Sequence, residues 1–281
     1  DGLIYEGTWA AGQIGGTGTL TQSNGDVFEG ELVQGRREGK GRVTYANGDT
    51  YEGDFAGDKR QGQGIFKGAD GYAYEGTWTD GRIEGEGRVT YPDGSVYVGQ
   101  FRADQPDGKG TITYADGSTF EGDWVAGVIE GNGKATYANG VVYEGGFKGA
   151  QNDGFGIMTY ADGYRYEGNW AAGQREGNGK ATYPDGTVYE GNFARGQRAG
   201  QGKITMPDGF TYEGAWVNGE ISGQGRATYA NGDVYEGLFE RGKRQGVGTM
   251  TYASGEAETG DWNNGILAGT EAQPTAQTAD Q

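Results

Sequence analysis

The sequence contains no cysteine, no histidine and only five prolines among 281 residues. Without cysteine the chain has no disulfide and no thiolate metal site. Without histidine it lacks the commonest acid–base residue and metal ligand. No run approaches the roughly 18 consecutive apolar residues that span a bilayer. These absences exclude disulfide-stapled modules and transmembrane helices, and they leave the redox compartment undetermined.

Positive charge is also scarce. The chain has 23 Lys and Arg against 40 Asp and Glu, a formal net charge of −17. A charge of this sign repels both nucleic-acid phosphates and anionic lipid head groups at long range. We therefore expect no nucleic-acid partner, and we expect the charge to disfavour a membrane surface.

Glycine and aromatic residues, by contrast, are abundant. The 61 glycines and a hydrophobic content of 33% are typical either of disorder or of a repeat architecture with many turns. Disordered chains are poor in aromatics, whereas this chain has 19 Tyr, 10 Phe and 6 Trp, almost all at fixed spacing. The aromatic content therefore favours a folded tandem repeat.

A Tyr-Glu-Gly triplet, or a close variant of it, recurs every 23 residues without insertion. The last unit keeps Trp262 but is otherwise degenerate, which predicts a frayed cap. We expect a repeat array over residues 1–269, followed by a disordered tail over residues 270–281. The twelve predicted units start at residues 5, 28, 51, 74, 97, 120, 143, 166, 189, 212, 235 and 258.

Each unit has the pattern of a β-hairpin. In the unit that starts at Tyr166, large and small residues alternate up to Trp170, and a glycine-rich loop then leads to a second short strand. Pro184-Asp185-Gly186 marks the turn into the next hairpin, because Pro presets one turn residue and Gly supplies a positive φ. The fold class predicted is all-β, with one antiparallel hairpin leading into the next.

Side chains alternate across a strand, so Tyr166, Gly168 and Trp170 share one face, and the opposite face carries Glu, Lys and Thr. Rings that lie over glycines would fill the space of the missing side chains. As a hypothesis for the register, Trp170 lies opposite Gly179, which places Tyr183 opposite Tyr166.

A longer period overlies the shorter one. From the third unit onward the second aromatic alternates between Phe and Trp, and the hairpin loops alternate between polar and apolar residues. Because apolar loop residues can make contacts between molecules, we expect them to mediate protein interaction and self-association as a homo-oligomer, namely a dimer. The unpaired sheet edges of the terminal hairpins are the alternative contact. The candidate interaction residues are Ile83, Ile129, Ile221 and Leu267.

The residues match a known pattern. Tyr212-Glu213-Gly214-Ala215-Trp216, followed by Gly219, Gly223 and Gly225, resembles the MORN (membrane occupation and recognition nexus) repeat. The resemblance covers nearly the whole chain. It implies an elongated, twisted, single-layer antiparallel sheet that serves scaffolds and membrane-contact proteins, with frequent oligomerisation and proposed phospholipid binding. Local departures occur at Leu32, Asp58, Gly68, Val98, Asp104, Ala150 and Met206.

Basic residues on alternate hairpin loops support a second hypothesis, a peripheral adaptor that binds anionic phospholipid. An electrostatic contact of this kind must weaken as salt rises. A third hypothesis is a surface carbohydrate or adhesion module that uses the ring faces. The candidate lipid contacts are Arg36, Arg37, Lys59, Arg60, Arg195, Arg198, Lys243 and Arg244.

No residue pattern indicates catalysis. Turn Asp residues such as Asp93 and Asp185 suggest calcium ligation, but Asn occupies the same position at Asn47 and Asn139, and both types simply favour such turns. The triplet Glu recurs in near-equivalent copies, which define no single active site. We predict a non-catalytic scaffold with no cofactor and no metal, not an enzyme. The compartment, whether cytoplasmic, periplasmic or secreted, stays open, since any signal peptide would lie upstream.

Overall fold

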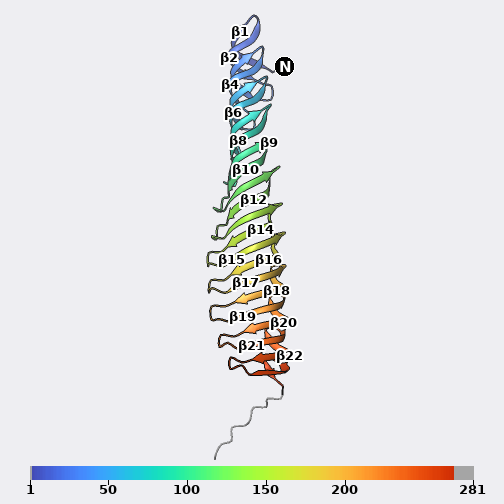
Figure 1. Cartoon of the computed structure of the whole chain (residues 1–281). Coiled ribbons are helices and arrows are strands. Elements are labelled where there is room, and N and C mark those ends of the chain that lie inside the picture. Colours follow the sequence, from blue (N-terminus) through green and yellow to red (C-terminus); the bar gives the residue numbers. More distant parts are fainter. Residues whose placement is uncertain (1, 269–281) are drawn as a thin grey trace, which may run out of the picture. The chain divides into compact units, whose positions relative to one another are not determined.

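The computed structural model describes residues 2–268, and in this range it consists of antiparallel strands joined by short turns. The chain divides into two compact units, residues 1–151 and 152–281. Within each unit the strands follow one another in chain order (Figure 1). The predicted all-β class of tandem antiparallel hairpins is confirmed. Over the described residues, no helix has the length and apolarity needed to cross a membrane.

The first unit contains β1 to β13, in which seven-residue strands alternate with nine-residue strands. Their bounds are β1 (Ile4–Ala10), β2 (Gln13–Thr21), β3 (Val27–Val33), β4 (Arg36–Thr44), β5 (Thr50–Ala56), β6 (Lys59–Lys67), β7 (Ala73–Thr79), β8 (Arg82–Thr90), β9 (Val96–Arg102), β10 (Gln105–Thr113), β11 (Thr119–Val125), β12 (Val128–Thr136) and β13 (Val142–Lys148).

The second unit repeats the alternation and ends on a two-residue strand. The boundary between the units falls at the first residue of β14. The bounds are β14 (Gln151–Thr159), β15 (Arg165–Ala171), β16 (Gln174–Thr182), β17 (Val188–Ala194), β18 (Gln197–Thr205), β19 (Thr211–Val217), β20 (Glu220–Thr228), β21 (Val234–Glu240), β22 (Lys243–Thr251), β23 (Ala257–Asn263) and β24 (Ile266–Leu267). The predicted tail lies outside the described residues.

Two kinds of turn connect the strands. Inside a hairpin the tip has two residues of positive φ, as at Asp80 (51°) and Gly81 (85°), a combination that matches the twist of the flanking strands. Between hairpins, the Ser95 amide donates to the Asp93 carboxylate at 2.8 Å, and Gly94 has a φ of 88°. The turn interpretation of the Asp-Gly pairs is therefore confirmed.

The predicted register inside the hairpin was wrong. Gly168 pairs with Gly179, and Trp170 pairs with Arg175. Two extra residues in β16 form a bulge between these pairs, so the glycine expected opposite the Trp lies further along the strand. Tyr183 follows the end of β16 and opens a turn.

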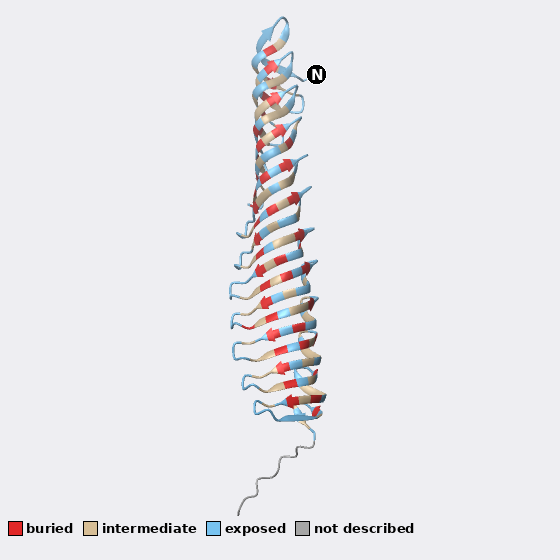
Figure 2. Cartoon of the chain, in the orientation of Figure 1, coloured by how far each residue is buried: buried red, intermediate tan, exposed pale blue. Residues whose placement is uncertain are grey.

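The predicted faces are confirmed. Tyr166 and Trp170 are buried whereas Asn169 between them is exposed, and buried and exposed bands alternate along the strands (Figure 2). Ala181, directly opposite both Tyr166 and Tyr189, is fully buried. The hydrophobic core of each unit is therefore one row of rings and small residues on a single face of the sheet.

Candidate interaction surfaces

The rings form a continuous ladder within each unit. Tyr51 lies edge-on to Phe55 of its own hairpin, with ring centroids 5.1 Å apart, and edge-on to Trp78 of the next hairpin at 5.4 Å. Tyr74 repeats the arrangement with Trp78 and with Phe101. The Tyr of a Tyr-Glu-Gly triplet thus contacts the second aromatic of its own hairpin and that of the next, which joins successive hairpins. The first two hairpins are an exception, because Leu32 replaces the ring that would contact Tyr5.

Strand glycines lie directly beneath the aromatic ring that begins each Tyr-Glu-Gly triplet. A Cβ built on Gly53 would be 2.6 Å from the Tyr51 hydroxyl, so only glycine fits. That hydroxyl donates to the Asp54 carbonyl at 3.1 Å, and burial raises the pKa of Tyr51 to about 12. Tyr51 has no exposed surface, so its ring face is closed to a ligand. The ring ladder thus gives no support to the carbohydrate hypothesis.

Arginines at the start of five even-numbered strands pack over this ladder. Arg60 places its guanidinium 4.1 Å from the centroid of the Trp78 ring, and Arg198 lies 4.5 Å from that of Trp216. The charged plane and the aliphatic stem both cover apolar surface here. We call them the bridging arginines: Arg37, Arg60, Arg175, Arg198 and Arg244.

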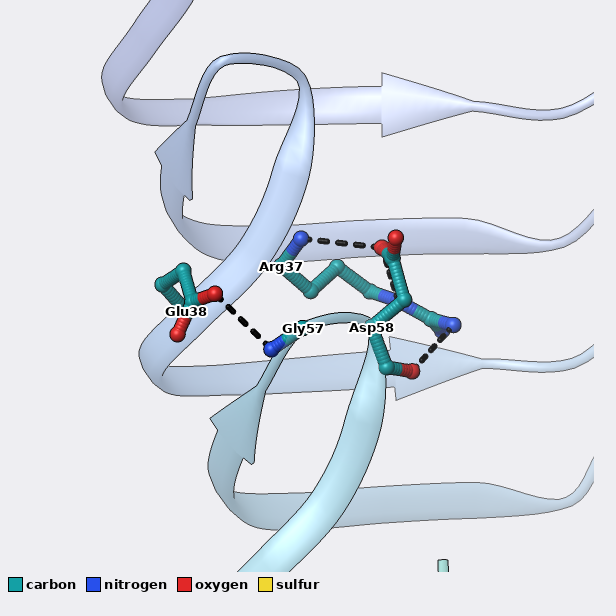
Figure 3. Close-up of polar contacts among 4 residues, drawn as sticks. All are labelled: Arg37, Glu38, Gly57 and Asp58. Carbon is teal, nitrogen blue, oxygen red and sulfur yellow. Dashed lines mark hydrogen bonds and ion pairs between the residues drawn. The ribbon is translucent and has the colours of Figure 1, made fainter. Parts of the chain in front are cut away.

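Arg37 shows how such a residue joins two hairpin tips. Its guanidinium donates to the Asp58 carbonyl at 2.7 Å, and its backbone amide donates to the Asp58 carboxylate at 2.9 Å (Figure 3). Asp58 has a φ of 71° where most tips have glycine. Asp104, with a φ of 70°, accepts from the Ile83 amide at 2.8 Å in the same way. These departures from the repeat pattern replace glycine by a residue that links tips.

A second link between tips escaped the sequence analysis. The Glu38 carboxylate accepts the Gly57 amide of the next tip at 2.8 Å (Figure 3), and Glu84 accepts the Ala103 amide at 3.0 Å. An acidic or amide side chain at one fixed position of the unit was the available signal. We call these residues the tip acceptors: Glu38, Gln61, Glu84, Asp107, Glu130, Asp153, Glu176 and Gln245.

The candidate lipid contacts fall into two groups. Four of them, Arg37, Arg60, Arg198 and Arg244, are bridging arginines and are half-buried. The other four are exposed, and Lys59 pairs with Asp80 at 3.0 Å. The exposed members are Arg36, Lys59, Arg195 and Lys243.

The four candidate apolar residues are not at the tips, where the sequence analysis placed them. Ile83 is the second residue of β8, pairs with Trp78 across the hairpin, and is only 6% exposed. Ile129 and Ile221 are half-buried against Trp124 and Trp216. The tip is two residues long, which draws these side chains into the strand. Leu267 is also half-buried, opposite Trp262.

The face opposite the rings is a charge ladder. Glu190 pairs with Lys180 at 2.8 Å, and Glu236 pairs with Arg226 at 2.9 Å. Glu167 lies directly across from Lys180, and Arg165 lies across from Thr182. Exposed pairs of this kind contribute about 0–1 kcal/mol each. They make this face polar and contribute little to the free energy of unfolding.

The titratable groups of the described residues do not converge on a reaction centre. A hydrogen bond from Ser118 lowers the pKa of Asp116, and one from Thr187 lowers the pKa of Asp185, so both carboxylates are engaged inside their own turns. No group of three or more acidic side chains that could hold a metal occurs in the described range. The geometry repeats from hairpin to hairpin and defines no unique acid–base pair.

Comparison with protein families agrees with this geometry. The sequence pattern of the MORN repeat matches eleven consecutive segments, namely residues 5–27, 28–50, 51–71, 74–96, 97–119, 120–142, 143–163, 166–188, 189–211, 212–234 and 235–257. This chain belongs to the MORN-repeat family. The predicted twelfth unit is not among the matched MORN segments, although β23 and β24 form a short hairpin there.

Solved structures resemble the MORN array only distantly. The SAS-4 (dCPAP) TCP domain of Drosophila melanogaster, in complex with a proline-rich motif of Ana2 (dSTIL), is 14% identical with a TM-score of 0.33. The alignment covers 70% of this chain and 88% of that one. The TCP10 domain of Danio rerio CPAP, in complex with a STIL peptide, is 14% identical with a TM-score of 0.34, over 92% and 99%. Similarity this low does not indicate what this chain binds. No curated protein matches the chain.

Proposed function

We propose that this MORN array is a non-catalytic scaffold that binds other proteins and associates with itself. One observation supports the proposal above all. The rings, the bridging arginines and the tip acceptors all hold one hairpin to the next, so function is left to the exposed surface. A repeated surface without a reaction centre is suited to binding.

Exposed apolar side chains gather at particular tips. Between β11 and β12, Val125 is 55% exposed and Val128 is 42% exposed, directly before the half-buried Ile129. The tip between β19 and β20 resembles it, with Val217 53% exposed near Ile221. We assign self-association to these tips, together with the candidate apolar residues beside them.

Sedimentation velocity over a range of protein concentrations tests self-association. We expect a shift to larger species with rising concentration, and we expect the pair Val125→Lys and Val128→Glu to suppress it. The matched control changes the equivalent cross-strand pair of a polar tip, Ala194→Lys with Gln197→Glu, and should leave the shift intact. A strictly monomeric protein at about 100 μM would contradict self-association.

Phospholipid binding is the weaker candidate, because four of its eight candidate residues lie over rings. Flotation with anionic liposomes at low and physiological salt examines it separately. An electrostatic contact through Arg36, Lys59, Arg195 and Lys243 must weaken as salt rises. Flotation that depends on those four residues would replace the scaffold proposal by a membrane adaptor.

A further inference from the structure

A row of side-chain amides crosses the face opposite the rings in the second unit. Each amide lies two residues from a charged residue of the charge ladder on its own strand, as Asn169 does from Glu167, so the two rows share one face. Asn192 is half-buried, the others are exposed, and Ala215 on β19 interrupts the row. We call these residues the amide row: Asn169, Asn178, Asn192, Gln201 and Gln224.

The corresponding row of the first unit is different. It carries charges, and several of its side chains pair with each other. Lys40 forms an ion pair with Asp54 at 2.9 Å, and Gln63 donates to the Thr77 hydroxyl at 3.0 Å. In the second unit, no residue at the corresponding positions from 155 to 247 is charged. The side chains of the amide row have no hydrogen-bond partner among the described residues, so they are free to bind a ligand.

A groove lies between the amide row and the charge ladder. It has a volume of about 760 Å³, and strand glycines such as Gly225 form its floor. Two of its side chains are positive and two are negative, so the charges cancel although the whole chain has a net charge of −17. The long polar side chains that line the groove are Gln201, Lys203, Glu213, Gln224, Arg226 and Glu236.

This groove does not suit a peptide or a nucleic acid. A peptide that adds as a strand needs an unpaired edge, whereas β18, β20 and β22 are each paired on both sides. Helical and polyproline segments need apolar or aromatic walls, and of the described side chains that line the groove only Val247 is apolar. A nucleic acid needs an excess of positive charge, which the balanced walls do not offer.

An uncharged chain of hydroxyl groups fits the groove. A side-chain amide both donates and accepts hydrogen bonds, and the neighbouring carboxylates and cations supply strong acceptors and donors for hydroxyls. Equivalent side chains, such as Glu213 and Glu236, recur on every second strand, about 9.6 Å apart. In a β-1,4-linked polysaccharide successive rings are turned over, so equivalent hydroxyls recur on every second ring. One ring of such a chain is close in length to one strand spacing.

An exposed aromatic ring precedes the amide row. Phe155 on β14 pairs directly with Asn169 and is 58% exposed. Every other repeat has a polar residue or valine at this position, so the packing of the repeat does not require the ring. A flat, exposed ring can stack on the apolar face of a sugar. From Phe155 on β14 to Gln224 on β20 there are six strand steps, which accommodate about six sugar rings.

We propose that the second unit binds an extended, uncharged, β-1,4-linked polysaccharide that crosses the strands along the amide row from Phe155 to Gln224. The binding face is opposite the ring ladder, whose buried rings take no part. The inference goes beyond the proposed scaffold function and does not depend on it, because self-association is assigned to the hairpin tips.

Isothermal titration calorimetry with cellohexaose, mannohexaose and N-acetylchitohexaose tests the proposal. We expect at least one of them to bind with a dissociation constant below about 1 mM. The double variant Gln201→Ala with Gln224→Ala should weaken that binding about tenfold, because it removes two amides from the groove. The matched control, Lys40→Ala with Gln63→Ala, changes the same repeat positions in the first unit and should alter the affinity less than about twofold.

Three further comparisons make the test specific. Phe155→Ala should weaken binding about fivefold through the lost stacking. Maltohexaose has α-linkages that curve the chain, and it should bind at least about tenfold more weakly. Raising the salt concentration from low to physiological should change the affinity less than about twofold, because the ligand is uncharged. Both variants of the second unit should keep the wild-type thermal midpoint, since the changed side chains are exposed.

Three results overturn the proposal: no heat of binding with any of the three β-linked hexasaccharides at about 5 mM, equal binding of maltohexaose, or unchanged affinity in the Gln201 and Gln224 double variant. Sedimentation velocity of the wild-type protein without sugar tests the scaffold function separately. If self-association persists while the sugars fail to bind, only the polysaccharide assignment is lost.

Discussion

Two parts of the first unit cover the ring ladder with different side chains. In the hairpins of β3–β4 and β5–β6, the ring ladder is covered by Arg37 and Arg60, whose side chains also reach the neighbouring tip or turn. From β7 to β12, the equivalent positions hold Ile83, Pro106 and Ile129. The ladder is buried in both parts, so the arginines do not make the core. They add cover to rings that are buried with or without them.

The largest effect we expect is common to both parts. Burial raises the pKa of Tyr51, despite an opposing effect of Arg60, and also raises the pKa of Tyr97, in each case to about 12. A folded pKa above the ordinary value of 10.0 means that the stability contributed is fully present below pH 10 and is lost as the pH rises towards 12. We expect cooperative unfolding in this window, measured by circular dichroism together with tyrosinate absorbance. Ionisation without unfolding would contradict it.

Removing one ladder ring tests whether the two parts share one core. Tyr51→Ala beside a bridging arginine and Tyr97→Ala in the part without bridging arginines should each lower the free energy of unfolding by about 3–5 kcal/mol. The two rings are equally buried, and each contacts one Phe and one Trp in the ladder. Urea denaturation measures both. A difference of more than about 2 kcal/mol would show that the arginine is part of the core.

The acidic tip residues Asp58 and Asp104 allow the two parts to be compared with and without an arginine partner. Asp58→Ala and Asp104→Ala each remove the acceptor of a backbone amide and leave alanine at a positive φ, a loss of about 2 kcal/mol. Asp58 also pairs with the Arg37 guanidinium at 3.4 Å, which adds less than about 1 kcal/mol because the Asp58 carboxylate stays exposed to water. Thermal unfolding should rank Asp58→Ala as slightly more destabilising. Equal losses would mean that this ion pair contributes nothing.

The smallest effect concerns a bridging arginine itself. Arg60→Ala should cost about 1 kcal/mol through lost stacking on Trp78. Arg82→Ala, at an exposed position of a hairpin without a bridging arginine, should stay within about 0.5 kcal/mol. Arg60→Lys should not restore the loss, because the flat guanidinium stacks and an ammonium does not. Chemical denaturation of the three variants decides the matter, and full rescue by lysine would reject stacking as the cause.

Sequence reasoning was most successful where one residue type has one physical use. The 23-residue period, the turn glycines and the shared face of rings and glycines all follow from local rules, and the structure confirms them. It failed for the hairpin register, because a bulge of two residues has no local signature. It also missed the tip acceptors, since Glu38 resembles any exposed Glu until the Gly57 amide is beside it.

The sequence by itself determined the repeat, the alternation of faces and the family, because strand periodicity and positive-φ turns are properties of neighbouring residues. Only the tertiary structure decided what the basic and apolar loop residues contact. Arg60 lies over Trp78 of the following hairpin and Ile83 packs into its own hairpin. Contacts between hairpins depend on how far the bulged strand bends each tip across the rings, and this geometry is set by packing rather than by any one residue.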